Sequence, residues 1–132
     1  MTTRYLLDTD WIIEYLRGRQ PVVRRVDELR GEGVALSMVS LAEIYESVSS
    51  SRNPQDAERQ LLEFLRGFPV LNIDPATCKL FGRERSRLRA IGRLIGDFDL
   101  LIGAIALQHG LILMTNNRRH FEMVGGLQLE SL

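Results

Sequence analysis

Four acidic side chains stand where helices are expected to begin, and three of these positions follow or border a short apolar segment. They are Asp8, Glu43, Asp97 and Asp99. In an open α/β sheet, reactive groups collect where strands end and helices begin, so carboxylates from distant segments can meet there. Carboxylates that meet stay ionised together only when a cation neutralises them. The pattern therefore predicts a divalent-cation site suited to phosphodiester hydrolysis.

Asp8 is the acid that local structure explains least. It ends the apolar run 4–7 and has no evident helix to cap, and burying it unpaired would cost on the order of several kcal/mol. Glu43 has a structural alternative, because Ser40 and Glu43 have the spacing of a capping box. Helix capping or a favourable first-turn charge could also explain the other acids, which are Asp10, Asp97 and Asp99.

Convergence of Asp8, Glu43 and Asp99 would require a bound cation. Two carboxylates about 4 Å apart repel by roughly 4 kcal/mol at an effective dielectric constant near 20. A helix dipole offsets only about 1 kcal/mol of this. Mg²⁺ or Mn²⁺ is the expected cofactor because these ions accept oxygen ligands. Gly103 follows Asp99 by one helical turn, which indicates either close helix packing or open space for a metal and a phosphate beside that carboxylate.

Short apolar segments alternate with helix-like segments along the whole chain, which predicts one α/β domain spanning residues 1–132. Parallel pairing with right-handed crossovers then gives a three-layer α/β/α sandwich around a mostly parallel sheet of four to five strands. The expected strands are 4–7, 34–38, 69–73, 111–114 and a short edge strand at 127–129. The expected helices begin near Asp10, Pro21, Ser40, Pro54, Asp74 and Asp97 or Asp99. Asp8, the start of the Ser40 helix and the 115–117 turn should then share the carboxyl edge of the sheet.

Composition limits the class of protein. The 132 residues are 45% hydrophobic and 26% charged, with a formal net charge of zero. No apolar run approaches the roughly 20 residues that span a bilayer, and the N-terminus lacks the features of a signal peptide, so we expect a cytoplasmic protein without membrane association. Cys78 is the single cysteine, which excludes an internal disulfide and a cysteine-based zinc site and predicts a buried structural thiol.

Arginine dominates the basic residues, and five arginines are concentrated between residues 83 and 93. They are Arg83, Arg85, Arg87, Arg89 and Arg93. Because the guanidinium group binds phosphate through two parallel hydrogen bonds, this group could follow an RNA backbone. A solvated helix face explains the same pattern equally well.

Several segments together resemble the PIN-domain ribonucleases, and within them the VapC-type toxins of prokaryotic toxin-antitoxin systems. The similarity covers nearly the whole chain and lies in the order and spacing of the segments 6–9, 40–43, 99–104 and 113–117. It implies a metal-dependent endoribonuclease with Asp8, Glu43 and Asp99 as acidic core. It also implies a cognate antitoxin and a homodimer.

The hypothesis of metal-dependent RNA hydrolysis also assigns supporting residues. Thr9, Thr115 and Asn117 would hydrogen-bond the metal ligands or the phosphate. The chain departs from the family at Asn117, where many relatives carry a fourth acid, and at Asp10, where they carry serine or asparagine. An amide at 117 would bind a metal only weakly, so Asp10 or Asp97 is the candidate for the missing charge.

Two other functions fit parts of the sequence. A phosphatase with Asp8 as the nucleophile and Asp10 as the acid would also place Asp-x-Asp after a strand. Such a site needs a lysine near the phosphate, and Lys79 lies midway along a predicted helix. A non-catalytic, receiver-like domain that binds Mg²⁺ or RNA needs a lysine at the end of a late strand, where Thr115 and Asn116 stand instead.

Overall fold

The computed structural model describes residues 2–132 and is built around a five-stranded parallel sheet. The strands are β1 (Tyr5–Leu7), β2 (Val34–Ser37), β3 (Val70–Leu71), β4 (Ile112–Met114) and β5 (Gln128–Glu130). Their order across the sheet is β3-β2-β1-β4-β5. The prediction of an α/β fold with up to five strands is confirmed, including the short edge strand near residue 128.

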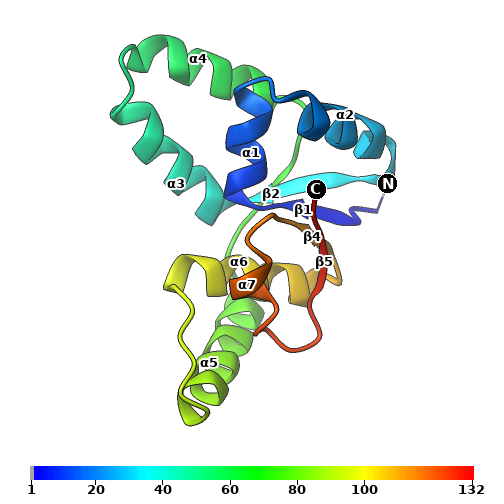
Figure 1. Ribbon diagram of the computed structural model, residues 1–132, viewed down its shortest axis with the longest axis vertical. Coiled ribbons are helices and arrows are strands. Elements are labelled where there is room, and N and C mark those ends of the chain that lie inside the picture. The colour runs from blue at the N-terminus through cyan, green and yellow to red at the C-terminus, as the bar shows by residue number, and fades with distance from the viewer. Residues whose placement is uncertain (1) are drawn as a thin grey trace.

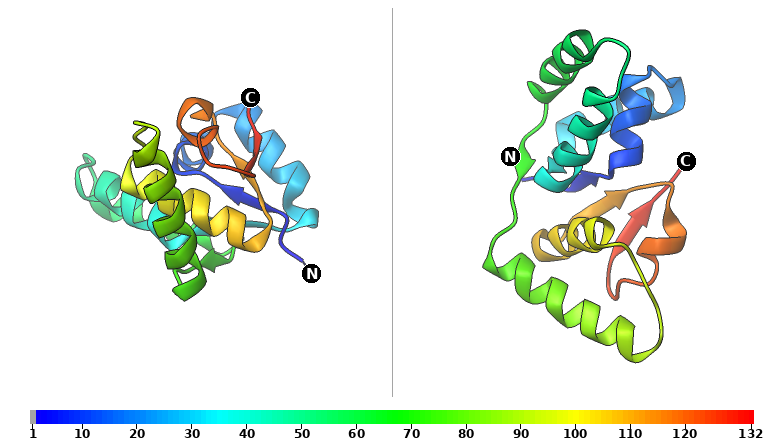
Figure 2. Two further views of the ribbon diagram at one scale, coloured as in Figure 1. Left: turned by 90° about the horizontal axis from the view of Figure 1, so that it is seen from below. Right: turned by 90° about the vertical axis from the view of Figure 1, so that its left-hand side faces the viewer.

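Helices cover both faces of this sheet (Figure 1). One face carries α1 (Thr9–Leu16), α2 (Gln20–Leu29), the short 3-10 turn η1 (Arg30–Glu32), α3 (Met38–Ser49) and α4 (Pro54–Leu65). The other carries α5 (Pro75–Ala90), α6 (Asp97–His109) and α7 (Arg118–Phe121). Figure 2 shows that α6 lies against the sheet and that α5 packs on the outer side of α6. No helix within residues 2–132 has the length and apolarity needed to cross a bilayer.

Alternation along β1 creates two hydrophobic cores. Tyr5 and Leu7 point toward the α1 to α4 side, where they join fully buried Trp11. Leu6 points to the opposite side and packs with α6 and with Phe121 of α7. Because β1 is central and buried on both faces, an uninterrupted apolar run is what the fold requires of it.

The strand order places the carboxyl ends of β1 and β4 at a switch point. From β1 the chain builds the sheet outward through β2 and β3, and it then returns to add β4 and β5 on the other side of β1. In open α/β sheets, ligands bind in the crevice formed where the strand order reverses. Asp8 follows β1 and Thr115 follows β4 directly, so both residues line this crevice, as the sequence predicted.

Two predicted helix caps are wrong. Ser37 caps α3 by accepting a hydrogen bond from the Ser40 backbone N–H at 3.0 Å, so Ser40 lies inside the helix and does not form a capping box with Glu43. Asp8 caps α1 by accepting from the Thr9 backbone N–H, which removes Asp10 from the cap position. The cap of α1 therefore lies two residues earlier than predicted, and that of α3 three residues earlier.

Of three other local predictions, one agrees with the structure, one is decided in favour of close packing and one does not agree. The Asp74 cap of α5 is confirmed. Gly103 leaves no open space beside Asp99, because an added Cβ there would contact Val124 and Leu127 at 3.5 and 3.6 Å. Cys78 is exposed on α5, contrary to the prediction of a buried thiol.

Candidate active site

Asp8 is a buried carboxylate with only neutral hydrogen-bond donors. It is 4% exposed, and its Oδ1 accepts from the Thr9 backbone N–H at 2.8 Å. Its Oδ2 accepts from the Thr115 hydroxyl at 2.7 Å, which joins the ends of β1 and β4. Burial and the neighbouring charge of Asp10 raise the pKa of Asp8 to about 7. The protonated form of Asp8 is therefore favoured near neutral pH, and a nearby positive charge would favour the ionised form.

Asp10 lies in the first turn of α1 and faces the same crevice. Its Oδ2 accepts from the Asn116 backbone N–H at 3.0 Å. Within residues 2–132 its buried Oδ1 has no hydrogen-bond partner. Burial raises the pKa of Asp10 as well. An unpartnered carboxylate oxygen beside Asp8 is a free acceptor for a cation or for a water bound to one.

Glu43 reaches the crevice from α3. The Thr9 hydroxyl donates to Glu43 Oε1 at 2.7 Å, and the Ser40 hydroxyl lies 2.9 Å from the same Thr9 oxygen. Burial, followed by the charge of Asp99, raises the pKa of Glu43. Ser40 thus supports the site through Thr9, a role that the sequence did not reveal because its spacing to Glu43 suggested helix capping.

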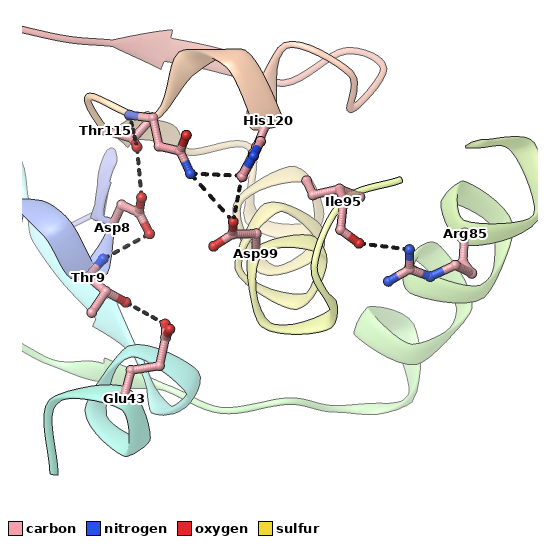
Figure 3. A network of polar contacts seen from close by, with 9 residues as sticks. Asp8, Thr9, Glu43, Arg85, Ile95, Asp99, Thr115 and His120 are labelled. Carbon is pink, nitrogen blue, oxygen red and sulfur yellow. Dashed lines mark hydrogen bonds and ion pairs between the residues drawn. The ribbon is translucent and has the colours of Figure 1, made fainter. Parts of the chain in front are cut away.

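Asp99 approaches from the opposite wall, in the first turn of α6 (Figure 3). Its Oδ2 lies 3.1 Å from Nδ1 of His120 and 3.5 Å from the amide nitrogen of Asn117. The charge of Asp99 contributes to the raised pKa values of both Asp8 and Glu43. The structure therefore brings the three predicted acids to one crevice. His120 also reaches this wall, although it was not singled out from the sequence.

Asp97 lines a surface hollow together with Glu43 and Asp99, but its carboxylate is paired with an arginine. Its side chain is 77% exposed and forms an ion pair with Arg85. Arg85 also donates to the Ile95 carbonyl at 2.8 Å and is drawn apart from the acids in Figure 3. The ion pair with Arg85 offsets the negative charge that Asp97 was expected to add, and an auxiliary role for Asp97 stays a prediction.

The predicted arginine group has two kinds of member. Arg85 and Arg87 have internal partners, since Arg87 donates to Glu84 and to the Met123 carbonyl. Arg83, Arg89 and Arg93 are exposed, and they form no ion pair within residues 2–132. Only these three could offer their guanidinium groups to a phosphate backbone.

The chemistry of the crevice suits a hard divalent cation. The carboxyl groups of Asp8, Asp10 and Glu43 all have raised pKa values. Oδ1 of Asp10 is buried without a hydrogen-bond partner in the part of the chain that the structure describes. Among the described residues, no three histidine, cysteine, aspartate or glutamate side chains are close enough to enclose an ion by themselves. Mg²⁺ commonly binds through one or two carboxylates and keeps several waters, so it does not require three such side chains around it.

Comparison with known proteins decides the family. The protein-family model of the PIN domain matches residues 5–127. This chain belongs to the PIN domain family. Among curated PIN-domain relatives, the tRNA(fMet)-specific endonuclease VapC of Shigella flexneri is 33% identical over 127 residues, covering 96% of each chain. Ribonuclease VapC2 of Haemophilus influenzae is 33% identical over 130 residues, covering 97% of each.

Solved structures agree with this assignment to the PIN domain family. VapBC2 from Rickettsia felis, bound to a promoter DNA fragment, matches with a TM-score of 0.92 and 26% identity, over 98% of this chain and 99% of that one. DNA-bound VapBC from Salmonella typhimurium also gives a TM-score of 0.92, with 25% identity over 98% of both chains. The arrangement of β1, α3 and α6 around the crevice is therefore that of a PIN domain.

Proposed function

We propose that this PIN domain is a divalent-cation-dependent endoribonuclease and the toxin of a type II toxin-antitoxin pair. The observation that carries the proposal is the meeting of Asp8, Glu43 and Asp99, from three separate elements, at the switch point of the sheet. The names of its relatives, which are VapC ribonucleases, support the choice of RNA as substrate.

Asp8 and Asp99 are the proposed ligands of Mg²⁺ or Mn²⁺, one on each wall of the crevice. When bound, the cation lowers the pKa of a water and neutralises the charge that develops on the scissile phosphate. Thr115 fixes the rotamer of Asp8 through its 2.7 Å hydrogen bond. Glu43, held by Thr9, is positioned to accept a proton from a water near the phosphate.

The phosphatase and receiver alternatives find less support. Lys79 is exposed on α5, which packs on the outer side of α6 (Figure 2), whereas Asp8 directly follows β1 of the central sheet. No lysine follows β4, where Thr115 instead donates to Asp8. The charge that a phosphoryl group would need beside Asp8 is therefore absent from these positions.

Cleavage assays with purified protein test the proposal. We expect Asp99→Asn and Glu43→Gln to lower the rate of RNA cleavage in Mg²⁺ by more than about 100-fold, the upper end of the cost of losing an outer-shell partner of a metal site. Asp97→Asn is the matched control, because Asp97 lies two residues from Asp99 and is paired with Arg85. Near-native cleavage by the Asp99 variant would remove that residue from the mechanism.

The exposed arginines are the proposed contacts to the RNA backbone. Arg83→Ala, Arg89→Ala and Arg93→Ala should weaken RNA binding and reduce its dependence on salt concentration, because each removes one phosphate contact. Arg85→Ala instead removes the ion pair with Asp97 and should act mainly on stability. Equal RNA affinities for the first three variants and the native protein would remove this surface from the proposal.

An antitoxin is the proposed protein partner, because the similar solved structures are VapBC complexes. A cavity of about 300 Å³ between α1, α3 and α4, lined by Ile13, Leu16, Ile44 and Val48 among others, suits the apolar face of a helix. Leu16→Glu should prevent co-purification with the product of the adjacent open reading frame. Leu62→Glu, on the exposed face of α4, should not. Homodimerisation is also proposed, and light scattering of the purified protein measures it directly.

A further inference from the structure

Three polar side chains meet closely on the α6 wall of the crevice. Nδ1 of His120 lies 3.1 Å from Oδ2 of Asp99 and 3.0 Å from the amide nitrogen of Asn117. The Asn117 amide nitrogen lies 3.5 Å from the same Asp99 oxygen. The three atoms thus form a small triangle that faces solvent on one side, since the side chain of His120 is 47% exposed and that of Asp99 is 24% exposed.

Each arrangement of hydrogens in this triangle leaves one unfavourable contact between two of the three groups. If Nδ1 of His120 accepts from one N–H of Asn117, the other N–H can reach Asp99, but no proton lies between Nδ1 and the Asp99 oxygen 3.1 Å away. If Nδ1 instead donates to Asp99, its N–H points toward the N–H of the Asn117 amide. Rotating the amide by 180° relieves that conflict, but it turns the amide oxygen toward the Asp99 oxygen.

A cation removes every one of these conflicts. Neighbouring ligands of an octahedral ion with bonds of about 2.1 Å lie about 3.0 Å apart. The separations of 3.0, 3.1 and 3.5 Å are close to that spacing, so the triangle resembles one face of an octahedron. Asp99 would provide a carboxylate oxygen, Asn117 its amide oxygen and His120 a neutral nitrogen.

We propose that His120 is a nitrogen ligand of the cation, adjacent to Asp99, and that it makes the site prefer a transition-metal ion such as Mn²⁺ over Mg²⁺. This inference rests on the proposed function, because it assigns a ligand to the same cation. Mg²⁺ takes oxygen ligands and rarely gives up water for imidazole, whereas first-row transition ions accept imidazole. A nitrogen donor therefore helps Mn²⁺ more than Mg²⁺.

The chain offers a clean spectroscopic test because it contains only two histidines, His109 and His120. Protein without a histidine tag is loaded with Mn²⁺ and examined by pulsed electron paramagnetic resonance for coupling to an imidazole ¹⁴N nucleus. We expect this coupling in the native protein and in His109→Gln, and its loss in His120→Gln. His109 is a matched control, since it is exposed in the last turn of α6.

Calorimetric titration with Mn²⁺ and with Mg²⁺ separates a ligand from a structural anchor. Loss of a ligand should weaken Mn²⁺ binding of His120→Gln at least about tenfold and Mg²⁺ binding much less. His120→Asp should shift the preference toward Mg²⁺, because it replaces nitrogen by oxygen. An anchor that merely holds Asp99 would weaken both ions equally, and that result overturns the proposal.

The outcomes also separate this inference from the proposed function. RNA cleavage that depends on the cation, together with Mn²⁺ binding that shows no ¹⁴N coupling or keeps it in His120→Gln, overturns only the assignment of His120. Absence of Mn²⁺ binding in the native protein, together with absence of cleavage in either ion, overturns both. Thermal unfolding of each variant confirms that the fold is intact.

Discussion

Two carboxylates in this molecule are equally buried and behave in opposite ways. Asp8, in the crevice, and Glu84, on α5, are each 4% exposed. Burial and the charge of Asp10 raise the pKa of Asp8 to about 7. Hydrogen bonds from Arg87, the largest influence, hold the pKa of Glu84 below its usual value despite its burial. Burial alone therefore does not set the ionisation of a carboxylate in this fold.

The hydrogen-bond partners of the two carboxylates explain the difference in their pKa values. Glu84 accepts two hydrogen bonds from Arg87, at 3.0 and 2.9 Å, and one from the Gly125 backbone N–H at 2.9 Å. Asp8 receives only neutral donors, and Asp10 beside it repels it. Glu84, which joins α5 to the loop before β5, is therefore paired with a cationic side chain, whereas Asp8 in the crevice is not. Energetic cost of this kind concentrates at functional sites.

Asp8→Asn should produce the largest effects and should separate activity from stability. We expect loss of RNA cleavage by more than about 100-fold in Mg²⁺, because a proposed cation ligand is removed. In metal-free buffer at pH 7.5 the same change should raise the free energy of unfolding by about 2–4 kcal/mol, since each pKa unit corresponds to about 1.4 kcal/mol. Chemical denaturation measures this gain. A variant both less active and less stable than the native protein would contradict the interpretation of Asp8 as a strained acid.

The pH dependence of stability should follow the same contrast. A folded-state pKa above the unfolded value means that the folded protein holds the Asp8 proton longer, so stability falls as pH rises from about 4 to 7. Glu84 has the opposite sign, and its contribution is lost as pH falls below its unfolded value of 4.5. Metal-free protein should therefore be most stable near pH 5. Addition of Mn²⁺ at pH 7.5 should restore stability to the native protein but much less to Asp8→Asn.

Glu84→Gln should destabilise the fold and leave the chemistry intact. The amide loses the charged hydrogen bonds to Arg87 and leaves its guanidinium group without an anion, so we expect a loss of about 1–3 kcal/mol. Thermal unfolding measures the loss, and RNA cleavage below the melting temperature should stay near the native rate. A large fall in the cleavage rate of folded Glu84→Gln would show that α5 contributes to catalysis as well as to stability.

Residues at strand ends were the part of the site that sequence could predict. A central parallel strand leaves an uninterrupted apolar run, so the acid that terminates it is visible, and this located Asp8. Asp99 and Thr115 followed for the same reason, because helix starts and strand ends share one edge of such a sheet.

Other features depended on contacts between distant segments. The start of α3 was misplaced because Ser37 and Ser40 both precede suitable helix residues. Only the contact between the Ser40 and Thr9 hydroxyl groups shows where Ser40 is used. His120 lies in a four-residue helix that is too short to produce a periodic pattern. Glu84 accepts a hydrogen bond from Gly125, 41 positions away, so local sequence could not show that its pair with Arg87 is anchored inside the fold.

The smallest effect should come from a carboxylate that has a partner but is not buried. Asp56, in the first turn of α4, pairs with Arg59 and accepts from Gln60, and the hydrogen bond from Arg59 lowers its pKa. Its side chain is 43% exposed, so water and salt screen the pair and replace it when it is lost. Asp56→Asn should therefore leave both the melting temperature and RNA cleavage unchanged within error. A loss of stability as large as that of Glu84→Gln would mean that pairing, and not pairing combined with burial, distinguishes Glu84 from Asp8.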